Sequence, residues 1–273
     1  MFLTRRAHSR PAVAARGVVA RAIARAKPVV PEGAWPVLLS LRSLAGPGPV
    51  VGRPAFARVL VLAAHPDDES VGAAGTLALL ADAGAEVRVV FATDGEATRG
   101  SALSRAETGA LRRGEAEAAC RVIGAGSPRF LGLADGGLTD QVPALAAAIS
   151  SLVAELAPEV VFLPWWLDDH PDHRALSAAL ARAGAPGNLE VWGYETWTPL
   201  PANRIVDISE VLDRKRRALE AHVTAHLAFD VSAALGLARW RSIHGLMGRG
   251  HAEAFIAAAL EDYIALMEAA ISD

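Results

Sequence analysis

The chain has little of several features that would place it in a specialised class of protein. One cysteine, Cys120, among 273 residues excludes an internal disulfide and is compatible with a reducing compartment, so we expect a cytoplasmic location. There is no run of roughly 18 uninterrupted apolar residues, and we therefore expect no transmembrane segment. Aromatic residues make up only 5% and charged residues 21%, but 52% hydrophobic residues exclude global disorder and indicate an alanine-rich α/β protein.

Charge is distributed unevenly along the chain. Residues 1–53 hold nine lysines and arginines and one acidic residue, which leaves 18 basic against 29 acidic residues in the remainder. A nucleic-acid site needs a basic face to neutralise phosphates. The acidic body therefore argues against nucleic acid as a partner.

Residues 1–54 are expected to form a basic N-terminal extension that ends in a Gly/Pro-rich linker over residues 45–54. Its best apolar run, residues 12–26, is interrupted by Arg16, Arg21 and Arg25, which is unsuitable for a secretory signal. Two interpretations stay open for this extension. It either lies on the protein surface or makes peripheral contact with an anionic membrane as a basic amphipathic helix.

Residues 55–273 are expected to form one α/β domain, because short apolar runs alternate with segments of helical period. The fold class is Rossmann-like, with a mainly parallel sheet of about five strands covered by helices. The expected strands are 58–64, 86–93, 129–133, 160–164 and 189–195. The expected helices are 71–83, 105–123, 142–155, 173–183, 208–222 and 252–270.

The first cluster of chemistry-bearing residues follows the first expected strand. The apolar run 60–64 stops at His65-Pro-Asp-Asp-Glu69. In a parallel sheet this is the carboxyl end of a strand, where ligands bind. His65 and Asp68, separated by a proline-containing turn, can face one ion, and imidazole and carboxylate are normal Zn²⁺ ligands.

A second cluster follows the fourth expected strand and includes Asp168-Asp-His170-Pro-Asp172-His173. His170 and His173 can face the same crevice and supply a third ligand, which would leave a catalytic zinc site with one open position. Either turn alone could simply cap a helix. Two His-Pro-Asp turns at two strand ends, in a chain with eight histidines, favour a shared metal site.

The two clusters resemble the Ala-His-Pro-Asp-Asp-Glu and His-Pro-Asp-His signatures of the LmbE-like, or PIG-L, family of zinc N-deacetylases, over roughly residues 56–270. The resemblance implies specific roles for six residues. His65, Asp68 and His173 would hold Zn²⁺, Asp67 would be the general base, His170 would assist at the carbonyl oxygen, and Asp172 would orient His170.

Chemistry is consistent with these roles. Hydrolysis of an unactivated amide needs an activated water, and zinc lowers the pKa of a bound water to about 7. Asp67, beside a ligand but not itself one, can take that water's proton. His170, if protonated, can donate to the oxyanion or to the departing amine, and Asp172 would raise the pKa of His170.

Weaker candidates surround these clusters. Arg99, on the loop after the second strand, and Tyr194, at the end of the fifth, are expected to contact substrate, although a solvated loop and core packing are the alternatives. Glu69 is expected to support a ligand rather than to be one. The family commonly shows His-x-Ser-Gln where this chain has Thr224 and Ala225, which leaves the substrate less defined.

The two clusters and Asp67 predict a metal-dependent hydrolase. The family resemblance implies that the metal is Zn²⁺ and that the enzyme removes an acetyl or other small acyl group from the nitrogen of an N-acetylglucosamine-type conjugate. An N-acyl amide hydrolase acting on a non-sugar metabolite is one alternative, and a non-catalytic α/β binding module that retains a metal is another. Fe²⁺ could take the place of Zn²⁺, because two histidines and one carboxylate also bind non-haem iron.

Overall fold

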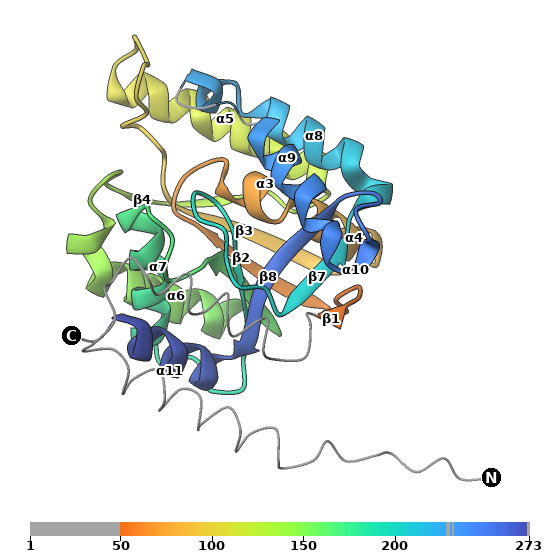
Figure 1. Cartoon of the computed structure of the whole chain (residues 1–273). Coiled ribbons are helices and arrows are strands. Elements are labelled where there is room, and N and C mark those ends of the chain that lie inside the picture. Colours follow the sequence, from red (N-terminus) through yellow and green to blue (C-terminus); the bar gives the residue numbers. More distant parts are fainter. Residues whose placement is uncertain (1–49, 228–229, 231, 272–273) are drawn as a thin grey trace, which may run out of the picture.

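The computed structural model describes residues 50–227, 230 and 232–271 (Figure 1). The expected basic extension therefore lies outside the described residues up to residue 49. The described part forms a central sheet with helices on both faces, which confirms the expected fold class.

The sheet has eight strands in the order β1-β7-β8-β6-β5-β2-β3-β4. All neighbouring pairs are parallel except those that β8 makes with β6 and β7. The strands are β1 (Val50–Val51), β2 (Arg58–Ala63), β3 (Glu86–Thr93), β4 (Arg129–Leu133), β5 (Val160–Pro164), β6 (Glu190–Tyr194), β7 (Arg204–Asp207) and β8 (Ala252–Ala259).

The helices divide between the two faces of the sheet (Figure 1). One face packs against α4, α5 and α8, and the other against α6, α7 and α11. Alternate residues of β2 supply the two cores: Leu60 and Leu62 face one layer, and Val59 and Val61 face the other. The helices are α3 (Asp68–Gly72), α4 (Ala74–Asp82), α5 (Arg105–Ile123), α6 (Val142–Leu156), α7 (Pro171–Arg182), α8 (Leu212–Ala221), α9 (Ser232–Arg241), α10 (Ile243–Leu246) and α11 (Leu260–Ile271).

The strand order reverses direction between β2 and β5. From β2 the chain proceeds to β3 and β4 on one side, and then returns to place β5 on the other side of β2. Parallel α/β sheets bind ligands in the crevice above such a switch point. Both His-Pro-Asp turns follow the two strands that flank it.

The expected secondary structure differs from the observed one in several places, and α9 and α10 were not expected. Residues 252–259 form the buried strand β8 and not the start of the C-terminal helix, because pairing with β6 and β7 overrides the helical propensity of the alanines. The strands β1 and β7 were not expected, and Val50–Val51 of β1 lies within the expected linker. The helix expected over 71–83 is divided into α3 and α4.

The described helices are short or carry polar residues. Among them, no helix combines the length and the apolar character that a bilayer crossing requires.

Candidate active site

The two His-Pro-Asp turns bring His65, Asp68 and His173 together above β2 and β5. His173 Nε2 lies 3.3 Å from His65 Nδ1 and 3.1 Å from Asp68 Oδ1. His65 Nδ1 lies 3.7 Å from Asp68 Oδ2. All three residues are buried or nearly so. The structure thus places the three predicted metal ligands at one point.

The separations fit a single metal ion. Bonds of about 2.0–2.1 Å in a tetrahedral arrangement separate neighbouring ligand atoms by about 3.3 Å. His170 extends the cluster, since one nitrogen from each of His65, His170 and His173 lies within 4.8 Å of the others. A two-histidine, one-carboxylate set with a third histidine nearby is a donor set suited to Zn²⁺ or Fe²⁺.

Carboxylates orient both histidine ligands from the side away from the cluster. His65 Nε2 lies 3.1 Å from Asp135 Oδ1 and 3.3 Å from Asp172 Oδ2, and His173 Nδ1 lies 2.9 Å from Asp168 Oδ1. Each carboxylate favours a proton on the ring nitrogen it faces. The opposite nitrogen then presents a lone pair to the cluster, as in carboxylate–histidine–metal arrangements.

The charges of the site favour a cation. Burial lowers the pKa of His65, but the Asp135 and Asp172 carboxylates outweigh it and raise that pKa to about 10. Burial lowers the pKa of His173 as well, and Asp68 and Asp168 raise it to about 9. Burial opposes ionisation of Asp68, yet His173 holds its pKa well below the usual value. The carboxylates thus stabilise positive charge where the ligand atoms converge.

Asp67 lies next to a ligand but outside the ligand triangle. Its φ of 133° is in a region that residues with a side chain rarely adopt, which marks a strained turn. Burial raises the pKa of the Asp67 carboxyl to about 6, the Arg112 guanidinium opposes that rise, and the Asp68 charge adds to it. Asp67 also lines a cavity to which His65, Asp68 and His170 contribute. It is therefore a carboxyl group that exchanges protons near neutral pH.

Two buried groups hold the Asp67 turn. Arg112 reaches from α5 to the Pro66 carbonyl and to Asp67 Oδ2, which is 3.2 Å from Nη2. From the other side, Glu69 Oε2 accepts the backbone amide of Asp67 at 3.2 Å, and Glu69 Oε1 lies 3.1 Å from His222 Nε2. The strained backbone is thus fixed by contacts from α5, α3 and the residue that follows α8.

His170 also lines the cavity. Burial, together with the nearby imidazoles of His65 and His173, lowers the pKa of His170. His170 Nδ1 accepts the backbone amide of Asp172 at 3.2 Å. A neutral imidazole held in this way carries its proton on Nε2. The lowered pKa favours the neutral imidazole, whose Nε2 can donate a hydrogen bond.

The side chain of Asp172 does not contact His170 as expected. Its Oδ2 accepts from Gly136 N at 2.8 Å and faces His65, and its Oδ1 accepts from Leu138 N at 3.0 Å. The start of α7 directs this carboxylate inward, where it is fully buried. The Asp172 carboxylate therefore contacts His65, one of the three predicted ligands, while the backbone amide of Asp172 donates to His170.

Tyr194 is not at the substrate cavity, contrary to expectation. The side chain is fully buried, and its hydroxyl donates to the Leu62 carbonyl at 3.0 Å. Tyr194, the last residue of β6, packs in the core layer that also contains Phe162 and Phe255. Arg99, in contrast, is exposed and lines the cavity, where a substrate contact is open to it.

Asp168 connects the metal cluster to the loop after β6. Its Oδ1 faces His173, while Oδ2 accepts from Thr196 Oγ1 at 2.7 Å and from the backbone amides of Trp197 and Thr198 at 3.0 and 3.2 Å. The loop places Trp197, which is 52% exposed, at the rim of the cavity. One buried carboxylate therefore fixes both a ligand and part of the cavity wall.

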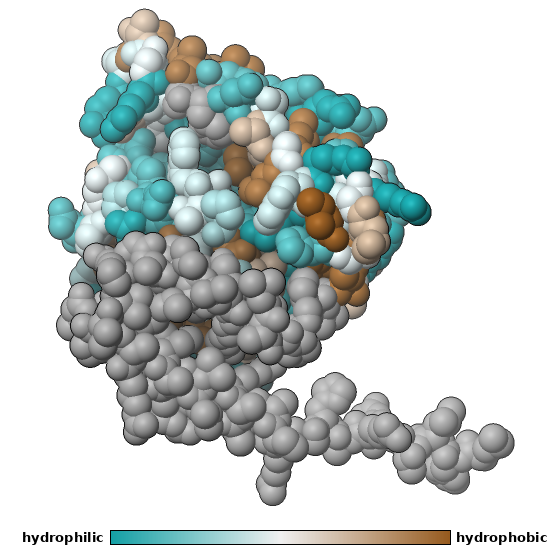
Figure 2. Space-filling view, in the orientation of Figure 1, coloured by the Kyte–Doolittle hydropathy of each residue, from teal (hydrophilic) through white to brown (hydrophobic). Residues whose placement is uncertain are grey.

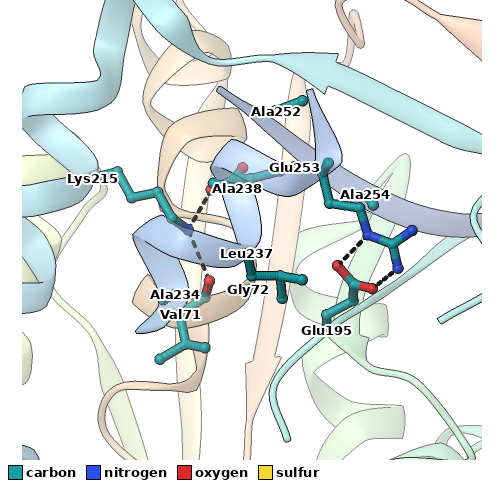
Figure 3. A pocket seen from close by; sticks show the side chains of 11 residues that line it. Val71, Gly72, Glu195, Lys215, Ala234, Leu237, Ala238, Ala252, Glu253 and Ala254 are labelled. Carbon is teal, nitrogen blue, oxygen red and sulfur yellow. Dashed lines mark hydrogen bonds and ion pairs between the residues drawn. The ribbon is translucent and has the colours of Figure 1, made fainter. Parts of the chain in front are cut away.

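A buried ion pair explains the break between α3 and α4. Lys215 Nζ donates to Val71 O at 2.8 Å and to Glu253 Oε1 at 2.7 Å (Figure 3). Glu253 also accepts the backbone amides of Gly75 and Thr76, at 2.9 and 2.7 Å. In a continuous helix Val71 O would accept from Gly75 N. The Lys215 ammonium and the Glu253 carboxylate replace that bond, so α3 ends at Gly72 and α4 begins at Ala74.

Two of the supporting carboxylates had no role in the sequence-based prediction. Asp168 precedes the second His-Pro-Asp turn by two residues, which is a usable signal. Asp135, just after β4, could only have been found as an acidic residue near a strand end. Ala225, which replaces the expected glutamine, lines the cavity, and Thr224 donates to Glu115 Oε1 at 2.7 Å.

Residues 60–183 match the model of the PIG-L family, described as GlcNAc-PI de-N-acetylase. The chain is 32% identical over 180 residues to a probable N-acetyl-alpha-D-glucosaminyl L-malate deacetylase 2 of Bacillus cereus, which covers 60% of this chain and 81% of the relative. It is 29% identical over 238 residues to a 1D-myo-inositol 2-acetamido-2-deoxy-alpha-D-glucopyranoside deacetylase of Rhodococcus jostii. That match covers 61% of this chain and 81% of the relative.

Two solved structures share the fold. The N,N'-diacetylchitobiose deacetylase of Pyrococcus horikoshii has a TM-score of 0.62 and 25% identity, and the match covers 76% of this chain and 86% of that one. A conserved protein of Thermus thermophilus has a TM-score of 0.61 and 30% identity, and the match covers 72% of this chain and 93% of that one. The chain therefore belongs to the PIG-L family, as its two His-Pro-Asp turns predicted.

Proposed function

We propose that the protein is a Zn²⁺-dependent hydrolase that removes an acetyl or other small acyl group from the nitrogen of an N-acetylglucosamine-type sugar conjugate. One observation carries the proposal: Asp68 belongs to the ligand triangle, while Asp67 lies beside it, faces the cavity and is free of the ligand set. The deacetylase names of the relatives support the choice of an N-acetyl amide and of an amino sugar.

His65, Asp68 and His173 would hold the ion. When bound, Zn²⁺ supplies Lewis-acid chemistry at this point of the cavity. The remaining steps belong to the side chains. Asp67 accepts a proton from the attacking water and can return it to the departing amine, since a pKa of about 6 suits both transfers near neutral pH.

His170 is assigned to the acyl oxygen. As a neutral imidazole with its proton on Nε2, it donates a hydrogen bond to the oxygen as negative charge develops there. Arg112 keeps Asp67 ionised and in position, and Arg99 at the rim is assigned to the polar part of the substrate. The cytoplasmic location and the membrane contact of the N-terminal extension stay predictions.

A purely structural metal site does not require a carboxyl group such as that of Asp67 outside its ligands. Closed metal sites fill all four positions with protein ligands, and a carboxyl group held in a strained turn and poised near pH 6 would serve no purpose beside them. This argues for hydrolysis over a non-catalytic binding module.

The test is amine release from N-acetylated sugars by the full chain. We expect the zinc-loaded protein to release amine from an N-acetylglucosaminide, detected with fluorescamine. A chelator should abolish this activity, and added zinc should restore it. Release at an equal rate by chelated protein, or no release from any N-acetyl sugar of a panel, would refute the proposal.

A further inference from the structure

The cavity above the metal cluster is larger than one sugar. Its volume is about 1000 Å³, at the upper end of the range of roughly 300–1,000 Å³ for small-molecule sites. An N-acetylhexosamine placed with its acetamide at Asp67 fills only part of this space. The remaining volume is available to the group attached to the sugar.

One side of the cavity is apolar. The helix α9 contributes Ala233, Ala234 and Leu237, whose spacing brings them to one helix face, and Val71 of α3 and Ala225 of the 3₁₀ turn Val223–Leu227 adjoin them. We call these five residues the apolar wall. None of their side chains carries a hydrogen-bonding group, so this wall can recognise only apolar surface.

The charged side chains that line the cavity are mostly acidic and therefore disfavour a bound anion. Arg112 lines it, but its guanidinium is engaged by Asp67 and the Pro66 carbonyl. Within residues 50–227, 230 and 232–271, this leaves Arg99 as the one lining lysine or arginine without a hydrogen bond or ion pair. Four carboxylates also line the cavity: Asp67, Asp68, Asp135 and Asp230. Among the described residues, the apolar wall itself contains no cationic side chain, and the four carboxylates disfavour an anion elsewhere in the cavity.

From the size, the apolar wall and the charge we infer that the substrate is an N-acetylated amino sugar whose attached group is uncharged and apolar, an alkyl or aryl glycoside in the simplest form. This inference rests on the proposed function, which places the sugar at the metal cluster. The attached group lies against Leu237 and its neighbours on α9, while the acetamide faces Asp67 and His170.

The apolar wall lies mostly outside the part of the chain that the family model matches. That match spans residues 60–183, which includes the metal cluster and Val71. The other four residues of the wall follow residue 183. The residues proposed to carry the reaction therefore lie in the segment that the family model matches, and most residues of the apolar wall lie after it.

In the coloured part of Figure 2, hydrophobic residues lie between hydrophilic ones on the face that Figure 1 shows.

The experiment compares three glycosides of N-acetylglucosamine that differ in the attached group: methyl, hexyl and 5-carboxypentyl. We expect kcat/KM of the full, zinc-loaded chain to be at least about ten-fold higher for the hexyl than for the methyl glycoside, through KM, because methylene groups are buried against the wall. The carboxypentyl glycoside should gain less, since its terminal carboxylate would lose hydration against the apolar wall and would face the carboxylates that line the cavity.

Leu237→Asp should reduce the hexyl-to-methyl ratio toward one. Ala233→Asp, at an exposed position of the same wall, gives the same test if the first variant does not fold. Leu111→Asp changes a leucine that is 48% exposed on α5 and does not line the cavity, and it should keep the wild-type ratio. An equal kcat/KM for methyl and hexyl glycosides in the wild type would overturn the inference.

A binding measurement separates this inference from the proposed function. Calorimetric titration of Asp67→Asn with the same glycosides should give at least about ten-fold tighter binding for hexyl than for methyl. Tighter hexyl binding without amine release from any glycoside would support the apolar wall and contradict the proposed function. Amine release with equal affinities for the three glycosides would do the reverse.

Discussion

The Arg112 guanidinium lies against the Asp67 carboxylate, with 3.2 Å between Nη2 and Oδ2. The same nitrogen contacts the Pro66 carbonyl, and Nη1 donates to Gly95 O at 3.2 Å and to Thr98 Oγ1 at 2.6 Å. Arg112 thus joins α5, the loop after β3 and the first His-Pro-Asp turn. It fixes the backbone that carries the proposed base and stabilises the ionised form of that base.

Removing this contact should move the pH dependence of the reaction. In Arg112→Met the opposing positive charge is lost, so the pKa of Asp67 rises above its present value of about 6. The base is then protonated over a wider acidic range. We expect the acidic limb of the kcat/KM profile to shift to higher pH by about one unit or more, while Arg113→Met, at a surface pair with Asp94, leaves the profile in place. An unshifted limb would contradict this role for Arg112.

The protonation of His170 makes a second test. Because its pKa is lowered and its Nδ1 accepts an amide, we propose that His170 acts as a neutral donor. We expect His170→Ala to lower kcat by about 10²–10³-fold, the loss typical of an oxyanion-stabilising donor, with metal content unchanged. The alkaline limb of the pH profile should survive in the variant. If that limb disappears, His170 acts as a charged acid and our assignment is wrong.

The sequence predicted those site residues that belong to short motifs and missed or misplaced those whose contacts depend on the tertiary fold. His65 with Asp68 and His170 with His173 are short motifs at strand ends, so their convergence followed from the parallel topology alone. Asp172 was assigned to the wrong histidine because the turn gives its position but not its direction. Tyr194 was misplaced because strand alternation alone does not tell which of the two faces a tyrosine at the end of β6 will take.

Long-range partners were the part that could not be predicted. Asp135 meets His65 across 70 residues of chain, and the pairing of Lys215 with Glu253 divides a helix that local pattern describes as continuous. The strand β8 has an alanine-rich composition that favours a helix. Only the neighbouring strands β6 and β7, whose edges it fills, make it extended.

Asp168 should couple metal binding to substrate binding. In Asp168→Asn a neutral amide replaces the carboxylate that faces His173 Nδ1. The loop after β6 loses its charged hydrogen-bond acceptor at Thr196. We expect zinc affinity to fall by about 10–100-fold and KM to rise in the same variant. Asp169→Asn, one residue along and exposed, serves as the control. Unchanged zinc affinity in Asp168→Asn, measured by competition with a chelating dye, would refute the coupling.

The Lys215–Glu253 pair should contribute to stability. Both side chains are at most 3% exposed, and Lys215→Met leaves the Glu253 charge buried without a counter-ion. We expect the free energy of unfolding to fall by about 3–5 kcal/mol, measured by urea denaturation. The pair of Arg216 with Asp213 is solvent-exposed, so Arg216→Met should change it by less than about 1 kcal/mol. Equal losses in both variants would show that the buried pair has no special role.

The most direct test of the account is to measure metal content and amine release together in Asp67→Asn. Because Asp67 lies outside the ligand triangle, the variant should keep about one zinc ion per chain, as the wild type does, while amine release falls by about a thousand-fold or more. Loss of the metal would show that Asp67 is a ligand. Amine release at the wild-type rate would show that the reaction uses another base, and either result would contradict the division of roles between Asp67 and Asp68.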